Sequence, residues 1–87
     1  MSIILEVEGL INRIIGLYGD VRRLRFRRRM IVRMMKAGGL NYAEKYANTD
    51  LAILHKRALI GELMHQLKQV MYSEGYATEC RLKRGVI

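Results

Sequence analysis

A long stretch without proline, residues 3–36, reads IILEVEGLINRIIGLYGDVRRLRFRRRMIVRMMK. Its apolar residues alternate at spacings of four and three, which is the repeat of an amphipathic helix with a coiled-coil-like seam. Arg28 interrupts this seam, because it is the one charged residue at a seam position. The pattern predicts a single helix over about residues 3–36, roughly 50 Å long at ~1.5 Å per residue. Nine residues form the seam: Ile3, Val7, Leu10, Ile14, Leu17, Val21, Leu24, Ile31 and Met35.

The residues at both ends of this helix indicate where it begins and ends, and its internal glycines indicate where it could break. Ser2 is a candidate N-cap, and Gly38 with Gly39 supplies a stop after a basic last turn. Gly19 and Asp20 offer an alternative, because a glycine weakens a helix interior and an aspartate can cap a new helix. The seam keeps its register through this point. We therefore favour one continuous helix with a bend near Gly19.

A second helix is expected to start near residues 48–50 and to end near residues 73–75. Ile53, Ile60 and Leu63 lie on one face of it, followed by Leu67 and Val70. The predicted fold is all-α: one helical domain over residues 1–75, built as a long hairpin, and a weakly structured basic tail over residues 76–87. A single hairpin cannot bury two broad apolar stripes completely. We therefore expect a dimeric helix bundle, with the nine seam residues at its oligomer interface.

Composition excludes several classes of protein. The chain has 87 residues and is about half hydrophobic, which is too apolar for a disordered basic tail. Its single cysteine, Cys80, cannot form a disulfide within the chain, so a secreted disulfide scaffold is excluded. Glu6 and Glu8 interrupt the apolar N-terminus, which is unlike a signal peptide, and no stretch is apolar enough to span a membrane. The expected location is the cytoplasm.

The positive charge is concentrated in one short segment. The chain has 16 Lys and Arg against 8 Asp and Glu, for a formal charge of +8. Residues 21–36 alone contain eight basic residues and no acidic one, so the remainder of the chain is electrically neutral. We predict that the exposed cations of this segment contact a phosphate backbone: Arg22, Arg23, Arg25, Arg27, Arg29, Arg33 and Lys36. Arg28, inside the seam, is expected to lie at an interface, and pairing with Glu62 or Glu74 is an alternative.

The arginine-rich half-helix indicates a polyanionic partner. Neighbouring cations without acids repel one another, and a nucleic acid would relieve this repulsion with release of counterions. Arginine also matches phosphate oxygens better than lysine, because its planar fork donates two parallel hydrogen bonds. The sequence predicts a small regulatory or accessory protein that binds DNA or RNA. The alternatives are a module that docks on an acidic surface of a larger protein machine, a self-assembling structural subunit, membrane-surface binding and a solubilising face.

No catalytic or cofactor site is expected. His55 and His65 are ten residues apart and fall on different faces of the second helix, which is unlike a metal pair. Cys80 has no neighbouring histidine base, so an ordinary thiol is expected. Two tyrosine pairs, at residues 42 and 46 and at residues 72 and 76, have the spacing of residues that close the ends of a bundle, and base stacking is the alternative. An enzyme, a bound metal and a cofactor are therefore not predicted.

Overall fold

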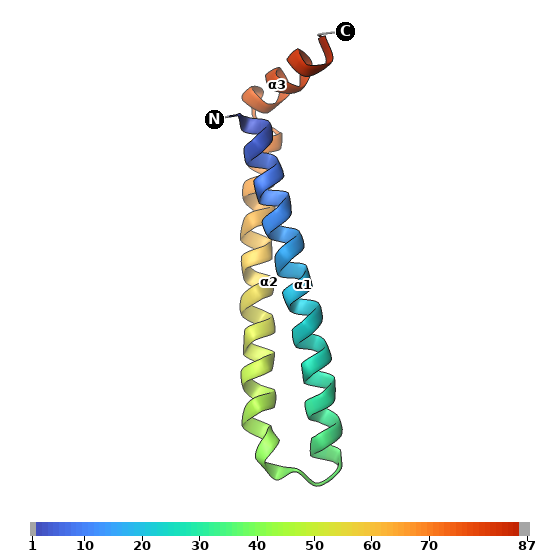
Figure 1. The fold of residues 1–87 in the computed structure, drawn as a ribbon. Coiled ribbons are helices and arrows are strands. Elements are labelled where there is room, and N and C mark those ends of the chain that lie inside the picture. The colour runs from blue at the N-terminus through green and yellow to red at the C-terminus, as the bar shows by residue number, and fades with distance from the viewer. Residues whose placement is uncertain (1, 86–87) are drawn as a thin grey trace.

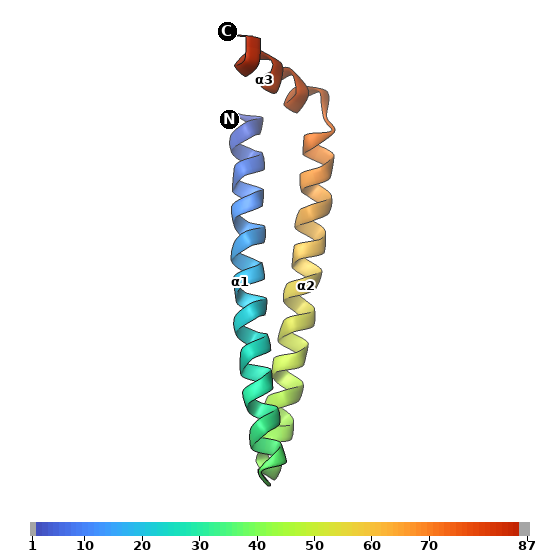
Figure 2. The same cartoon turned by 90° about the vertical axis from the view of Figure 1, so that its right-hand side faces the viewer.

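The computed structural model describes residues 2–85, with the side chains of all of these except residues 40, 74 and 83–85. Helix α1 (Ile3–Lys36) leads through a short 3-10 turn, η1 (Leu40–Tyr42), into helix α2 (Ala43–Met71). A shorter helix, α3 (Glu74–Gly85), follows. Helices α1 and α2 lie side by side and antiparallel, and α3 crosses the open end of the pair (Figures 1 and 2). The predicted helical hairpin is confirmed.

Helix α1 is one unbroken helix of 34 residues. The alternative break at Asp20 does not occur, because Asp20 forms its contacts from within the helix, with Arg23 one turn later and with Lys56 on α2. The glycines at positions 9, 16 and 19 have no neighbouring atom within 4 Å of a would-be Cβ, so no tertiary contact requires them. The regular apolar seam thus outweighs the poor helix propensity of these glycines.

The connector reverses the chain within a few residues. Gly38 has a φ of 99°, a left-handed conformation that an L side chain rarely adopts. The N–H groups of Gly38 and Gly39 donate to the carbonyls of Met35 and Met34 at 3.1 and 3.0 Å, which satisfies the end of α1. A Cβ at Gly39 would approach the Tyr42 ring to 2.6 Å, so the tight reversal also needs this second glycine. The predicted stop at these two glycines is confirmed.

Helix α2 begins five residues before the expected start near residue 48. Glu44 lies in its first turn, where a carboxylate favours the positive end of the helix dipole. Thr49 is buried and does not cap the helix, because its hydroxyl donates to the Lys45 carbonyl one turn earlier at 2.8 Å. Asp50 instead points to α1. The expected start was wrong because residues that favour caps can also satisfy themselves inside a helix.

The core is the seam between the two long helices. Leu10, Ile14 and Val21 of α1 pack with Ile53, Ile60 and Leu63 of α2 in one buried cluster. Ile53 is the most buried residue of this core, at 2% exposure. The predicted apolar faces of both helices are therefore the faces that meet.

Helix α3 occupies the segment that we expected to be weakly structured. Ser73 caps it, since its hydroxyl accepts the Tyr76 N–H at 3.2 Å. Glu79 then ties α3 to the start of α1: its carboxylate accepts the N–H groups of Ile3 and Ile4, both at 3.0 Å. The absence of a clear apolar period hid this helix from the sequence pattern. Residues 86 and 87 of the expected tail lie outside the described residues.

The molecule is a thin rod of 65 × 21 × 17 Å. Its radius of gyration is 19.5 Å, against about 12 Å for a compact domain of this length. Each long helix has one main partner, so its outer face stays in solvent. Side chains of the arginine-rich segment consequently lie on an extended and accessible surface.

Candidate functional site

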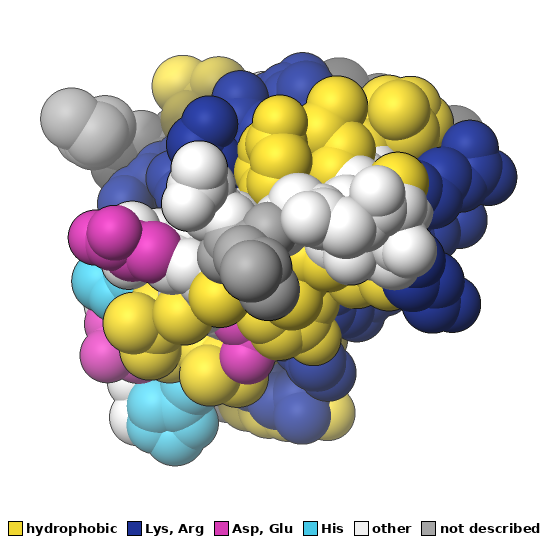
Figure 3. All heavy atoms as spheres, turned by 90° about the horizontal axis from the view of Figure 1, so that it is seen from below, with side chains coloured by type: hydrophobic (Ala, Val, Ile, Leu, Met, Phe, Trp, Pro, Cys, Tyr) yellow, Lys and Arg dark blue, Asp and Glu magenta, His cyan; other side chains and the backbone are white. Residues whose placement is uncertain are grey.

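The arginine-rich segment forms the second half of α1, next to the connector. Because α1 is continuous, the backbone holds all of these residues in a fixed order around one helix. Seven predicted phosphate-binding residues are exposed: Arg22, Arg23, Arg25, Arg27, Arg29, Arg33 and Lys36. Figure 3, which looks at the connector end, shows Lys and Arg side chains gathered around the α1 side and most visible acidic side chains opposite.

Arg28 pairs across the hairpin with Asp50. Its guanidinium donates to the Asp50 carboxylate at 2.6 Å, and both side chains are about one-third to two-fifths exposed. The alternative pairing with Glu62 does not occur, because Glu62 lies twelve residues beyond Asp50 along α2, a rise of about 18 Å. The Glu74 side chain lies outside the described part of the chain. The seam interruption at Arg28 is thus matched by an acid on the partner helix.

Asp20 neutralises a second group of cations on the opposite flank of α1. Its carboxylate accepts a hydrogen bond from Arg23, and its second oxygen lies 3.4 Å from Lys56 Nζ. The Arg23 hydrogen bond, with help from Lys56, holds the pKa of Asp20 below its ordinary value. Asp20, Arg23, Arg27 and Lys56 line a shallow groove of about 330 Å³ together with Leu24. This flank therefore carries mixed charge.

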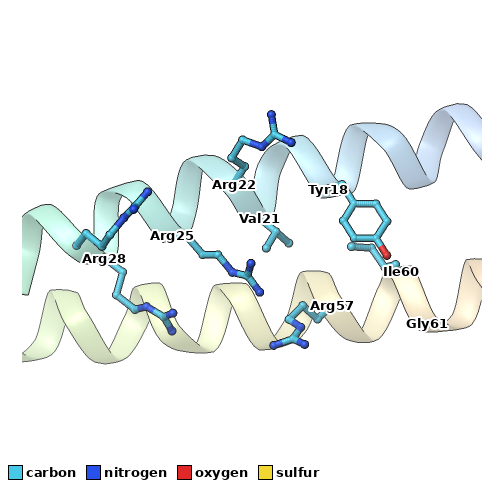
Figure 4. A pocket seen from close by; sticks show the side chains of 9 residues that line it. Tyr18, Val21, Arg22, Arg25, Arg28, Arg57, Ile60 and Gly61 are labelled. Atoms are coloured by element: carbon cyan, nitrogen blue, oxygen red, sulfur yellow. The ribbon is translucent and has the colours of Figure 1, made fainter.

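The other flank of α1 forms a larger groove against α2, of about 870 Å³. We call it the arginine groove. Figure 4 shows Arg25 and Arg28 extending from α1 toward α2, Arg57 lying along α2 and Arg22 pointing away from α2. Its complete lining is Tyr18, Val21, Arg22, Arg25, Arg28, Arg29, Arg57, Ile60 and Gly61.

Acids are scarce around the arginine groove. Of its arginines, Arg28 alone has an ion-pair partner among the side chains that the structure describes. Arg22, Arg25, Arg29 and Arg57 form no ion pair with a described acidic side chain. The structure thus divides the arginine-rich segment into a partly neutralised flank at Asp20 and the flank at the arginine groove, where Arg22, Arg25 and Arg29 have no described acidic partner.

Arg57 is the residue that sequence reasoning missed. It lies in α2, in a part of the chain with little net charge, so a sum along the sequence hides it. The antiparallel register provides the missing signal: the Arg28–Asp50 contact implies that Arg57 lies near residue 21 of α1. Pairing positions across the hairpin would have placed it beside Arg22 and Arg25.

The nine seam residues mostly lie inside the single hairpin. Five are buried, namely Val7, Leu10, Ile14, Val21 and Ile31, and Leu17 and Leu24 pack against the same core. Ile3 is half-buried near α3, and Met35 is 38% exposed. A single chain therefore already uses most of the seam.

The remaining candidate residues form no cluster. His55 and His65 are exposed on α2, and Cys80 is half-buried on α3. Among the described residues, no three His, Cys, Asp or Glu side chains gather in a metal-like group. Tyr46 lies with Val32 and Met35 at the connector end, whereas Tyr72 is 87% exposed. The tyrosine pair at residues 42 and 46 thus has a member packed at the connector end of the hairpin.

Comparisons with known proteins identified no relative of the chain. No family model, curated protein or solved structure matches the chain. Within residues 2–85, no helix has the length and apolar character needed to cross a membrane. The functional argument consequently rests on the geometry and charge of the arginine groove.

Proposed function

We propose that the protein binds nucleic acid, DNA or RNA, and that the arginine groove is the centre of the contact surface. The observation that carries this proposal is that Arg22, Arg25 and Arg29 of α1 line one groove together with Arg57 of α2. Bringing like charges together costs electrostatic free energy, and a phosphate backbone offsets that cost while it releases counterions. The exposed Arg27, Arg33 and Lys36 extend the same basic surface along α1.

The mode of binding that this surface favours has little sequence preference. Guanidinium groups recognise phosphate oxygens through paired hydrogen bonds, and such contacts position a protein without reading bases. The fold presents its cations along a straight rod rather than on a separate element that contacts base edges. A small accessory or regulatory factor that coats or bends nucleic acid fits this surface, and no catalytic role is proposed.

The test is an anisotropy titration with labelled nucleic acid at increasing salt. Affinity should fall linearly on a log–log plot, with a slope of about −0.7 to −0.9 per phosphate contacted. The double variant Arg25→Gln/Arg29→Gln should reduce the magnitude of that slope by about two. Absence of binding at low salt, or binding that is insensitive to salt, would contradict the proposal.

A matched control separates groove binding from general charge attraction. The double variant Arg13→Gln/Arg81→Gln also removes two exposed cations, one from α1 and one from α3, but neither side chain lines the arginine groove. It should stay near wild type in affinity and slope. Equal losses in the two double variants would place the contact outside the arginine groove.

Association of two hairpins is the second part of the proposal. Its support is the number of large apolar side chains that a single hairpin leaves in solvent, such as Leu5, Ile15, Leu51 and Leu82, each more than 60% exposed. Pairing two rods into a four-helix bundle would remove such surface from water. Sedimentation equilibrium should give twice the chain mass of 10.1 kDa. A mass of one chain at every concentration would refute the association.

A further inference from the structure

The arginine groove contains one aromatic side chain, and its position suggests a role. Tyr18 lies one turn before Arg22, at the end of the groove nearer the open end of the hairpin (Figure 4). Its hydroxyl contacts the Met64 sulfur of α2 at 4.0 Å. The Tyr18 side chain is nevertheless 53% exposed. The hydroxyl edge of the ring thus contacts α2, and the ring is open to a ligand.

We infer that the arginine groove binds single-stranded nucleic acid, with an unpaired base stacked on Tyr18 and the following phosphates held by Arg22, Arg25 and Arg29. This inference rests on the proposed function and specifies its substrate class. A positively charged groove combined with an aromatic platform is the arrangement by which single strands are bound without sequence reading.

The spacing along α1 fits a strand laid parallel to the helix. Tyr18, Arg22, Arg25 and Arg29 follow one another at intervals of four, three and four residues, which places one side chain per turn on the same flank. At ~1.5 Å per residue, the row is about 16 Å long. A strand in this groove therefore meets the aromatic ring first and then a guanidinium at each turn.

The width of the groove favours one strand over two. Its floor is made of Val21, Ile60 and Gly61, between two helices in direct contact. Packed helices have axes about 8–10 Å apart, so the space between them is narrower than a DNA duplex, whose major groove alone is about 12 Å wide. A duplex would rest on the rims of the groove. Its bases are also stacked within the helix, so Tyr18 would have no open base face to contact.

Gly61 contributes space to this floor. A Cβ at Gly61 would meet no atom within 4 Å, so the groove is open above α2 at this point. The variant Gly61→Leu keeps every charge of the groove and adds bulk to its floor. It should weaken single-strand binding, whereas a duplex on the rims would be insensitive to it.

The experiment compares three probes under the same salt conditions: a twelve-nucleotide deoxythymidine oligomer, the matching oligouridine, and a twelve-base-pair DNA duplex. Wild-type protein should bind the single strands at least about fivefold more tightly than the duplex, the lower end of what one stacked base contributes. The DNA and RNA oligomers distinguish the two sources of single strand. Duplex binding as tight as single-strand binding would overturn the inference.

Substitutions at Tyr18 test the stacking directly. Tyr18→Leu should lose at least about fivefold in single-strand affinity, and Tyr18→Phe, which keeps the ring, should retain it. The control is Phe26→Leu, since Phe26 is 60% exposed on α1 but does not line the groove. Circular dichroism establishes that each variant is helical.

The outcomes also separate the two proposals. Salt-dependent binding of the duplex, with Tyr18→Leu equal to wild type, overturns the single-strand inference and leaves the proposed function standing. Failure of all three probes to bind at low salt overturns both proposals.

Discussion

The Glu79 carboxylate accepts the backbone N–H of Ile3 at 3.0 Å, although 76 residues separate them in the chain. The Ile4 N–H reaches the other oxygen at 3.0 Å, and the Ser2 hydroxyl donates to it at 2.8 Å. A helix N-terminus leaves N–H groups without partners inside the helix, and a nearby side chain normally caps them. Here α3 supplies the cap from a distant part of the sequence, so α3 and the start of α1 are joined.

Glu79→Gln should lower the thermal midpoint by a few degrees at neutral pH. The amide keeps an acceptor but loses the negative charge that the N–H groups and the helix dipole favour. Those hydrogen bonds, from Ile3 and Ile4 first, hold the pKa of Glu79 below its ordinary value. Glu62→Gln, which removes the same charge from an exposed position on α2, is the control and should leave the midpoint unchanged.

Acid should abolish the difference between Glu79→Gln and wild type. Because the pKa of Glu79 is lowered in the folded state, its stabilisation is complete above the unfolded value of about 4.3. The stabilisation is lost as the pH falls through the lower folded value. Thermal melts at pH 7 and at successive steps below pH 4 measure this convergence. A gap that persists at the lowest pH would contradict capping by the ionised form.

A double-mutant cycle on Arg28→Gln and Asp50→Asn should give a coupling of about 0.5–1 kcal/mol. Both side chains are partly exposed, so solvent screens much of their attraction. Urea unfolding at low and high salt provides the measurement, and salt should reduce the coupling. The same cycle with Glu62→Gln in place of Asp50→Asn should give no coupling. Equal couplings in the two cycles would reject the observed register.

Ile53→Ala should destabilise the hairpin by about 2–5 kcal/mol, because it opens a cavity at the most buried position of the seam. Gln69→Ala, at an exposed polar position of the same helix, should change stability by less than about 0.5 kcal/mol. Denaturant unfolding of both variants gives the comparison. Similar losses in the two variants would contradict the placement of Ile53 in the core.

Two glycines should respond to alanine in opposite directions. Gly16→Ala should stabilise the protein by up to about 1 kcal/mol, since it lies in the interior of α1 with open space around it. Gly38→Ala should destabilise by about 1–2 kcal/mol, because Gly38 has a left-handed φ of 99°. Thermal unfolding distinguishes the signs. A stabilising Gly38→Ala would contradict the observed connector.

The local pattern of apolar residues predicted the long elements well. The four-three spacing from Ile3 to Met35 and the glycines at 38 and 39 were enough to predict α1 and its end, because both features act through neighbouring residues. The start of α2 was placed too late because Thr49 and Asp50 resemble caps, whereas tertiary packing buries the first and ion pairing occupies the second.

The groove and the third helix depend on contacts between distant residues. Arg57 joins Arg25 only once the connector sets the register of α2 against α1, and no short-range pattern states that register. Glu79 similarly acquires its role from the start of α1. The arginine-rich segment was visible in the sequence, but its division between the Asp20 flank and the arginine groove required the fold.

The hairpin reversal also makes the rod electrically lopsided. Residues 21–57, at the connector half, contain eleven basic and two acidic residues, and the remainder contains five basic and six acidic. Because the chain doubles back, the basic part of α1 and the basic part of α2 share one end instead of lying at separated points. The field of a polyanion exerts a torque on such a charge distribution and turns the connector end toward it before contact. The rod would therefore approach the polyanion with its connector end first. The open end and α3 would then point away from the charged surface.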